Sequence, residues 1–325
     1  MFHKQVTPHV SASTKKTASS FPVESEYARC VTALNRTGIL VHLPESGSAG
    51  VTGIDGREYP LPAREEVAAL FDHNRDLVEQ KVPQGFDRLE LTPMAMPVPL
   101  LIDTLSEAVL RHAGDRTIFR TRRSPADPLI PVLVNSEKIV WIWETLRQAF
   151  DTDRLVYFPQ EDPGHRKGEA EYQGQTKSEA INNKNICAIP GWSVGLIEST
   201  PIMPGPGEGT TRAGRKQLEI GLSPREYLRA LQEPAYAGET GTTLEDFITQ
   251  FLTRLETTNE VSNDISDNNA LWCLGQYMKI SYAEVVPAGR WHRPVGRVRL
   301  DMHRTGNKRC TWNVGAATVV RLVGH

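Results

Sequence analysis

Apolar residues recur at helical spacing in three stretches of the first half of the chain, residues 63–82, 100–113 and 136–150. Such spacing places them on one face of a helix, so each stretch predicts an amphipathic helix. Trp141 and Trp143 are expected to pack the third. Residues 38–44 predict a strand, and Asp55-Gly56 between two extended runs predicts a β-hairpin.

The second half predicts a strand, two helices and then several short strands. Residues 191–199 have a strand's composition. Ser223 and Thr243 each precede a helical pattern and are followed three positions later by Glu226 and Asp246, which is the signature of a capping box. Apolar segments at residues 270–279, 282–289, 296–303 and 318–323 predict strands parted by polar loops.

Two polar stretches suggest how the chain is organised. Residues 1–22 contain Ser, Thr and Lys but no acid, which predicts a disordered tail, although such a composition also fits an organelle-targeting peptide. Residues 159–186 predict a long linker. We therefore expect an α/β or α+β scaffold domain at residues 23–185 and a second domain at residues 186–325, which makes the fold class α+β.

The composition excludes several classes of protein. The 325 residues carry a net charge of −2, and 23% of them are charged, as in ordinary soluble proteins. Four distant cysteines without a CxxC spacing argue against a zinc site and a disulfide scaffold. No apolar run approaches the roughly 18 residues of a membrane span. We expect a cytoplasmic protein with no membrane partner, no metal and no cofactor.

The end of the chain differs from the rest in its charge. Residues 289–325 contain eight basic residues and one acid, Asp301, a net of seven positive charges, together with Trp291, Trp312 and three histidines. Arginine and tryptophan dominate binding hot spots, and such a surface suits anionic or π-rich ligands. The alternative is that the arginines form the solvated face of a strand and the tryptophans are core. The nearly neutral total charge disfavours nucleic acid as the partner.

The order of elements in residues 191–325 resembles the C-type-lectin fold, in which two helices lie against a small sheet and the first and last strands pair. The resemblance implies that residues 318–323 pair with residues 192–198. The end of the chain is similar to the formylglycine-generating-enzyme-like branch of that fold, through Gly289-Arg290-Trp291, Asn313-Val314-Gly315 and Val319-Val320-Arg321-Leu322. Ala316-Ala317 stand where that branch has Phe-Arg.

The same branch includes the variable proteins of diversity-generating retroelements, whose last loops are mutagenised to vary ligand binding. The resemblance implies a non-enzymatic ligand-binding protein whose partner is an unknown protein or an anionic ligand. The arrangement also resembles bacterial proteins. From this resemblance and the local charge, the expected ligand-binding residues are Trp291, His292, Arg293, Arg297, Arg299, His303, Asn307, Lys308, Arg309, Thr311, Trp312 and Asn313.

Two other functions stay open at this point. The first is an oxidative or metal-dependent enzyme of the formylglycine-generating type, which would use Cys310 beside two basic residues, or His292 and His303 with Asp301 around iron. Cys273, in an apolar strand, fits an inert core residue instead. The second is a cytoplasmic interaction scaffold whose partner docks on the N-terminal helices.

Overall fold

The computed structural model describes residues 21–159, 174–199, 202–267, 269–280, 283–305 and 313–324. The α-helices in these residues are α1 (Val23–Thr37), α2 (Arg64–His73), α3 (Arg75–Lys81), α4 (Val98–Asp115), α5 (Glu144–Arg147), α6 (Lys177–Asn182), α7 (Pro224–Ala230) and α8 (Leu244–Thr258). The first strands are β1 (Val41–His42), β2 (Ala49–Thr52), β3 (Glu58–Pro60), β4 (Phe86–Thr92), β5 (Val140–Ile142), β6 (Leu155–Tyr157), β7 (Ser193–Glu198), β8 (Thr211–Arg212) and β9 (Arg215–Lys216). The later strands are β10 (Glu239–Gly241), β11 (Ala270–Trp272), β12 (Gln276–Ile280), β13 (Ala283–His292), β14 (Arg297–Arg304), β15 (Val314–Ala316) and β16 (Thr318–Arg321).

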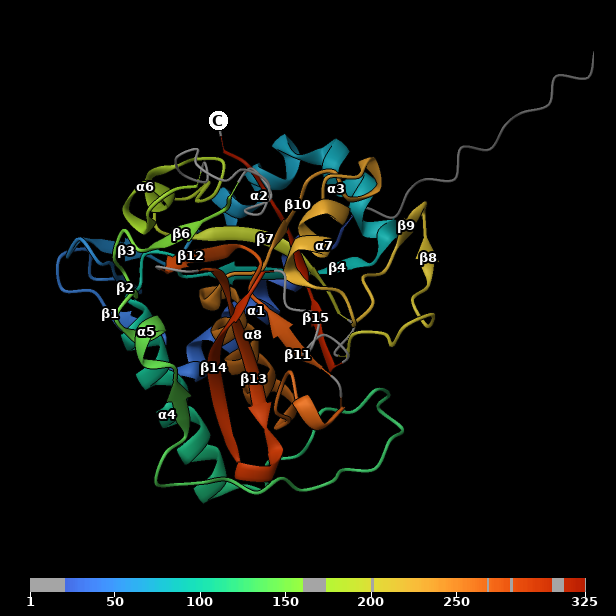
Figure 1. Cartoon of the computed structure of the whole chain (residues 1–325). Coiled ribbons are helices and arrows are strands. Elements are labelled where there is room, and N and C mark those ends of the chain that lie inside the picture. The colour runs from blue at the N-terminus through green and yellow to red at the C-terminus, as the bar shows by residue number, and fades with distance from the viewer. Residues whose placement is uncertain are drawn as a thin grey trace, which may run out of the picture.

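Two larger sheets build the fold (Figure 1). One has the order β10-β16-β7-β4, and the other has the order β15-β11-β13-β12-β6, with β14 beside β13 and β5 beside β14. Strands from both sides of residue 185, where we predicted a domain boundary, pair in both sheets: β4 with β7, β6 with β12 and β5 with β14. A single hydrophobic cluster also includes residues from both segments. The two parts of the chain therefore share their sheets and their core, within an α+β architecture.

The last strand lies inside the four-stranded sheet. β16 is antiparallel to β7, with Val320 opposite Leu196, and it is paired with β10 on its other side. The guanidinium of Arg321 binds Asp246 of α8 at 2.5 Å and Ser193 of β7. The predicted pairing of residues 318–323 with residues 192–198 is confirmed, and it anchors the carboxyl end to both a sheet and a helix.

α8 is the central helix of the molecule. Its predicted capping box is confirmed, because Thr243 accepts a hydrogen bond from the backbone nitrogen of Asp246. Phe247 lies against Gly289 of β13 so closely that a Cβ added to this glycine would meet the ring at 2.6 Å. α8 also contacts α1 and α4. The larger sheet therefore buries its inner face against a helix that other helices cover in turn.

Several local predictions are confirmed. The Asp55-Gly56 turn joins β2 to β3 in an antiparallel hairpin. α2 and α3 cover the first predicted helix, with a break at Asn74, and α4 covers the second. Ser223 caps α7 with Glu226 at the capping-box position. In each case the signal lies within a few residues of chain.

The helix predicted over residues 136–150 is wrong. The segment forms β5, which pairs in parallel with β14, and then the short helix α5. Its β-branched residues Val140 and Ile142 suit a strand, and the edge of the sheet supplies the hydrogen bonds that decide between the two states. Trp143 is consequently 46% exposed, and Trp141 lies on β5 with its ring beside Arg299 of β14.

The predicted linker also contains structure. Residues 177–182 form α6, with a capping box between Thr176 and Glu179. Lys177 is buried and lies 2.7 Å from Asp151 and 3.1 Å from Glu245 of α8. The remaining linker residues 160–173, and residues 1–20 of the predicted tail, lie outside the described residues.

Candidate functional site

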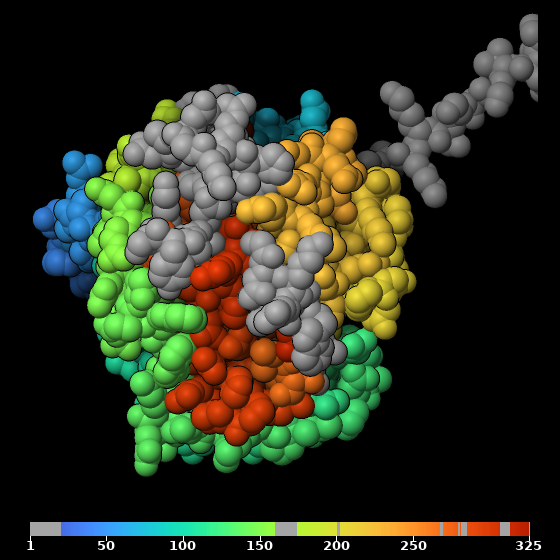
Figure 2. All heavy atoms as spheres, in the orientation of Figure 1, coloured from blue at the N-terminus to red at the C-terminus, as the bar shows by residue number. Residues whose placement is uncertain are grey.

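β13 and β14 form the most extensive strand pair in the described chain, and their register decides which side chains share a face. Arg290 lies opposite Arg299, and His292 opposite Arg297. Side chains alternate along a strand, so every second residue points to the same side. Trp291, Val298 and Leu300 point inward and are fully buried. The outward set, which we call the arginine–histidine face, consists of Arg290, His292, Arg297, Arg299, Asp301 and His303. Figure 2 shows part of this hairpin, in red, at the surface beside the segment that carries β5.

Positive charge exceeds negative charge on the arginine–histidine face. Asp301 forms ion pairs with both Arg290 and Arg299, the latter at 3.2 Å. Arg297 is a third cation, and the paired segments 286–292 and 297–303 contain no other acid. The guanidinium carbon of Arg299 also lies 4.4 Å from the ring centroid of Trp141, which is a cation–π contact. The carboxylate of Asp301 therefore pairs with two of the three guanidinium groups of this face.

The two histidines of this face are neutral at neutral pH. Burial lowers the pKa of His292, and the charges of Arg299, Arg290 and Arg297 lower it further. Burial also lowers the pKa of His303, against the opposing effect of Asp301. Each imidazole then offers one donor and one acceptor to a partner.

Several nitrogen atoms of the face have no hydrogen-bond partner in the described part of the chain. They are Nε of Arg297 and of Arg299, Nδ1 of His292 and Nε2 of His303, and all four are shielded from solvent. Buried polar atoms are nearly always hydrogen-bonded, so unpaired ones need a reason. A bound ligand with hydrogen-bonding groups would supply one.

The fold brings together four of the residues that the sequence pointed to, His292, Arg297, Arg299 and His303. Trp291 is not part of this surface: it is 0% exposed, and its ring centroid lies 6.3 Å from that of Phe251 of α8. The alternation along β13 turns Trp291 to the opposite side from His292, so its place in the structure is the core.

The other predicted residues lie in different settings. Arg293 is in the turn between β13 and β14, and its Nε donates to Asp264 at 2.7 Å. Asn313 directly precedes β15 and is half-buried. The rest lie outside the described residues, namely Asn307, Lys308, Arg309, Thr311 and Trp312, together with Cys310.

Three members of the site were missed as ligand-binding residues. Asp301 could have been found from the sequence, because it alternates with Arg299 and His303 on the strand predicted at residues 296–303. Arg290 was missed because the strand predicted at residues 282–289 ended before it, whereas β13 extends to His292. Trp141 could not have been found from the sequence, because it reaches Arg299 only through the parallel pairing of β5 with β14. That contact joins segments more than 150 positions apart.

The residues proposed for an enzyme are not assembled. His303 lies opposite Val286 and His292 opposite Arg297, so six positions of β13 separate the two histidines, about 20 Å at the rise of a strand. The described residues contain no group of three side chains that could hold a metal ion. Cys273 is fully buried, so its predicted place in the core is confirmed, and burial raises the pKa of its thiol well above the usual value.

Comparison of the chain with protein-family models, with curated proteins and with solved structures found no match. The resemblance to the formylglycine-generating-enzyme-like branch therefore stays a prediction. None of the helices among the described residues has both the length and the apolar character that crossing a membrane requires.

Proposed function

We propose that this protein is a non-enzymatic binding protein that recognises an acidic partner through the arginine–histidine face. The observation that carries the proposal is that three arginines share a face with one carboxylate, that of Asp301, which pairs with only two of them, and that Nε of Arg297 and of Arg299 is buried with no hydrogen-bond partner among the described residues. Guanidinium groups bind carboxylates in a two-pronged geometry, and they are favoured wherever such groups must be recognised.

The surroundings of the face support a binding role. Its residues lie on two long paired strands, and side chains on strands are held more precisely than side chains on loops. Trp141 adds an aromatic surface beside Arg299, and Arg with Trp is the composition of energetic hot spots in protein interfaces. The partner we propose therefore presents carboxylates next to an apolar group, as an acidic peptide segment does.

A peptide-display selection tests this proposal. Peptides rich in Asp, Glu and aromatic residues are selected on the wild-type protein and then measured against the Arg297→Glu/Arg299→Glu variant. We expect the selected peptides to bind the variant at least about tenfold more weakly, because two attractive contacts become repulsive.

The control replaces two arginines that lie elsewhere on the surface. Arg64 and Arg75 lie on α2 and α3 and are 51% and 66% exposed, so they are more accessible than Arg299, which is 26% exposed. Arg64→Glu/Arg75→Glu should leave peptide affinity unchanged. Selected peptides that bind the charge-reversed face as tightly as the wild type would contradict the proposal.

We further propose that the residues before β15 vary among related copies of this protein, as the resemblance to retroelement variable proteins implies. A loop can change in sequence without unfolding its domain when the strands on both sides of it are fixed, and β14 and β15 are fixed by pairing with β13 and β11. Sequencing around the gene tests the idea. We expect a near-copy of its 3′ end that differs mainly at adenines, beside a reverse transcriptase gene; its absence would remove this extension and leave the binding face.

A further inference from the structure

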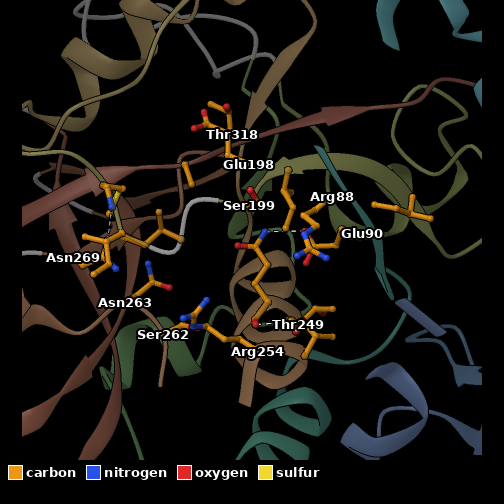
Figure 3. A pocket seen from close by; sticks show the side chains of 18 of the residues that line it. Arg88, Glu90, Glu198, Ser199, Thr249, Arg254, Ser262, Asn263, Asn269 and Thr318 are labelled. Atoms are coloured by element: carbon orange, nitrogen blue, oxygen red, sulfur yellow. Dashed lines mark hydrogen bonds between the residues drawn. The ribbon is translucent and has the colours of Figure 1, made fainter. Parts of the chain in front are cut away.

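A hollow of about 460 Å³ lies beside α8, and among the described residues no member of the arginine–histidine face lines it. Its walls come from α8, α1, β4, the end of β7, residues 202–204 and residues 215–218 (Figure 3). This volume is in the range of small-molecule pockets. We call it the α8 cavity.

α8 turns a polar stripe toward this cavity. Thr249, Thr253 and Thr257 follow at intervals of four residues, with Gln250 and Arg254 beside them. Polar groups inside a protein need partners, and most of this stripe has them. Gln250 donates to Oε2 of Glu90 at 2.7 Å, and the hydroxyls of Thr253 and Thr257 donate to carbonyls one turn back on α8.

The hydroxyl of Thr249 is the exception. The residue is 1% exposed, and its Oγ1 makes no hydrogen bond within the described residues. Nε of Arg254 is also buried and has no hydrogen-bond partner within the described residues. Figure 3 shows Arg254 near Ser262 and Asn263, Thr249 close by on the same helix, and Arg88 and Glu90 farther away along the cavity. α8 therefore contributes two unfilled hydrogen-bonding positions, five residues apart.

Among the described residues the cavity wall carries four arginines and two acids, and one of these acids, Glu198, pairs with Arg215 at 2.7 Å. On one side Arg29 and Arg88 share the carboxylate of Glu26. On the other side Arg254 shares the carboxylate of Glu260 with Arg122. Because each carboxylate pairs with two guanidinium groups, both sides keep an excess of positive charge. This excess favours an anionic ligand.

Glu90 does not cancel this excess at neutral pH. Burial raises the pKa of its carboxyl to about 8, and the charge of Asp246 adds to the rise, while Gln250, Arg321 and Arg29 oppose it. The protonated carboxyl is a hydrogen-bond donor rather than a charge.

We propose that the α8 cavity binds a small organic carboxylate with an apolar body and a second hydrogen-bonding group at its far end. The carboxylate accepts from Arg254, and the far group pairs with the hydroxyl of Thr249. The apolar body lies against Ile197, Met203 and Leu218, which are among the apolar residues of the wall. This site is separate from the arginine–histidine face and does not depend on the function proposed for that face.

Calorimetric titration with small carboxylates and their amides tests the charge requirement. The probes are hexanoate, benzoate, 2-naphthoate and 6-hydroxy-2-naphthoate, each compared with its amide of the same shape. We expect saturable binding of at least one carboxylate, with its amide about tenfold weaker or worse, because the charged hydrogen bond is lost. The proposal is overturned if none of the carboxylates binds, or if the amides bind equally well.

Variants then locate the bound carboxylate. Thr249→Val should raise its Kd about fivefold, because one hydrogen bond is removed, and should leave the melting temperature of the free protein unchanged or higher, because an unpaired buried hydroxyl disappears. Thr104→Val on α4 is the matched control: that hydroxyl is also buried, but it donates to the Leu100 carbonyl at 2.9 Å. The carboxylate should bind the Thr104→Val variant with the same Kd as the wild type.

Arg299→Ala separates this proposal from the one above. It should weaken the binding of acidic peptides and leave the carboxylate's Kd unchanged. A Kd that rises with Arg299→Ala, or that stays constant with Thr249→Val, would overturn the assignment to the α8 cavity.

Discussion

The two faces of the β13–β14 hairpin have opposite chemistry, although their residues alternate one by one along the same strands. The inner face presents Gly289, Trp291 and Leu300 to α8 and is fully packed. The outer face presents His292, Arg297, Arg299 and His303, which are partly exposed and have side-chain nitrogen atoms without a hydrogen-bond partner among the described residues. The packing of the inner face therefore provides stability that the outer face does not need to supply.

The largest effect should come from the inner face. Trp291→Ala is expected to cost about 3–5 kcal/mol in the free energy of unfolding, because it leaves a cavity against Phe251. Urea denaturation measures the loss. Trp143→Ala is the control, since that side chain is 46% exposed and its truncation should cost less than about 1 kcal/mol. Equal losses for the two variants would mean that the faces do not differ as described.

Substitutions of the basic residues near the carboxyl end should also differ sharply in their effect on the free energy of unfolding. Arg321→Met is expected to cost about 3 kcal/mol or more, because it leaves Asp246 buried without its partner. Adding Asp246→Asn should restore part of this loss, which a double-mutant cycle of unfolding free energies would detect. Strict additivity of the two changes would show that the pair is not coupled.

On the outer face the same kind of substitution should matter little for folding. Arg299→Met is expected to cost less than about 1 kcal/mol, because a partly exposed ion pair and a cation–π contact contribute little. The variant should nevertheless lose affinity for acidic peptides. A stability loss comparable with that of Arg321→Met would place Arg299 among the structural residues instead.

The smallest effect concerns pH. The pKa of His292 and that of His303 are lowered in the folded protein, so protons bind more readily to the unfolded chain. Their contribution to stability is complete above about pH 6.5 and is lost as the pH falls below that value, because the unfolded chain then takes up protons that the folded protein does not. Urea denaturation of His292→Asn/His303→Asn between pH 7 and pH 5 should show a flatter dependence than the wild type. An unchanged slope would mean that these imidazoles do not have lowered pKa values.

Local signals in the sequence determined much of this protein. Ser223 and Thr243 marked the starts of two helices because a capping box needs only four residues, and Asp55-Gly56 marked a hairpin because the turn's geometry is set by those two residues. The alternation of basic and apolar residues in residues 297–303 likewise predicted the two faces of β14.

Tertiary structure decided what depended on distant partners. Residues 140–142, within the segment predicted to be a helix, form a strand because they pair with β14, and that pairing brings Trp141 to Arg299. Arg321 and Arg299 both stand between apolar residues in a strand pattern. Arg321 is nevertheless buried against Asp246, whereas Arg299 lies at the surface. The α8 cavity exists only where α8 meets β4 and α1. A pattern in sequence specifies which residues share a face, but burial and charge pairing depend on what the fold packs against that face.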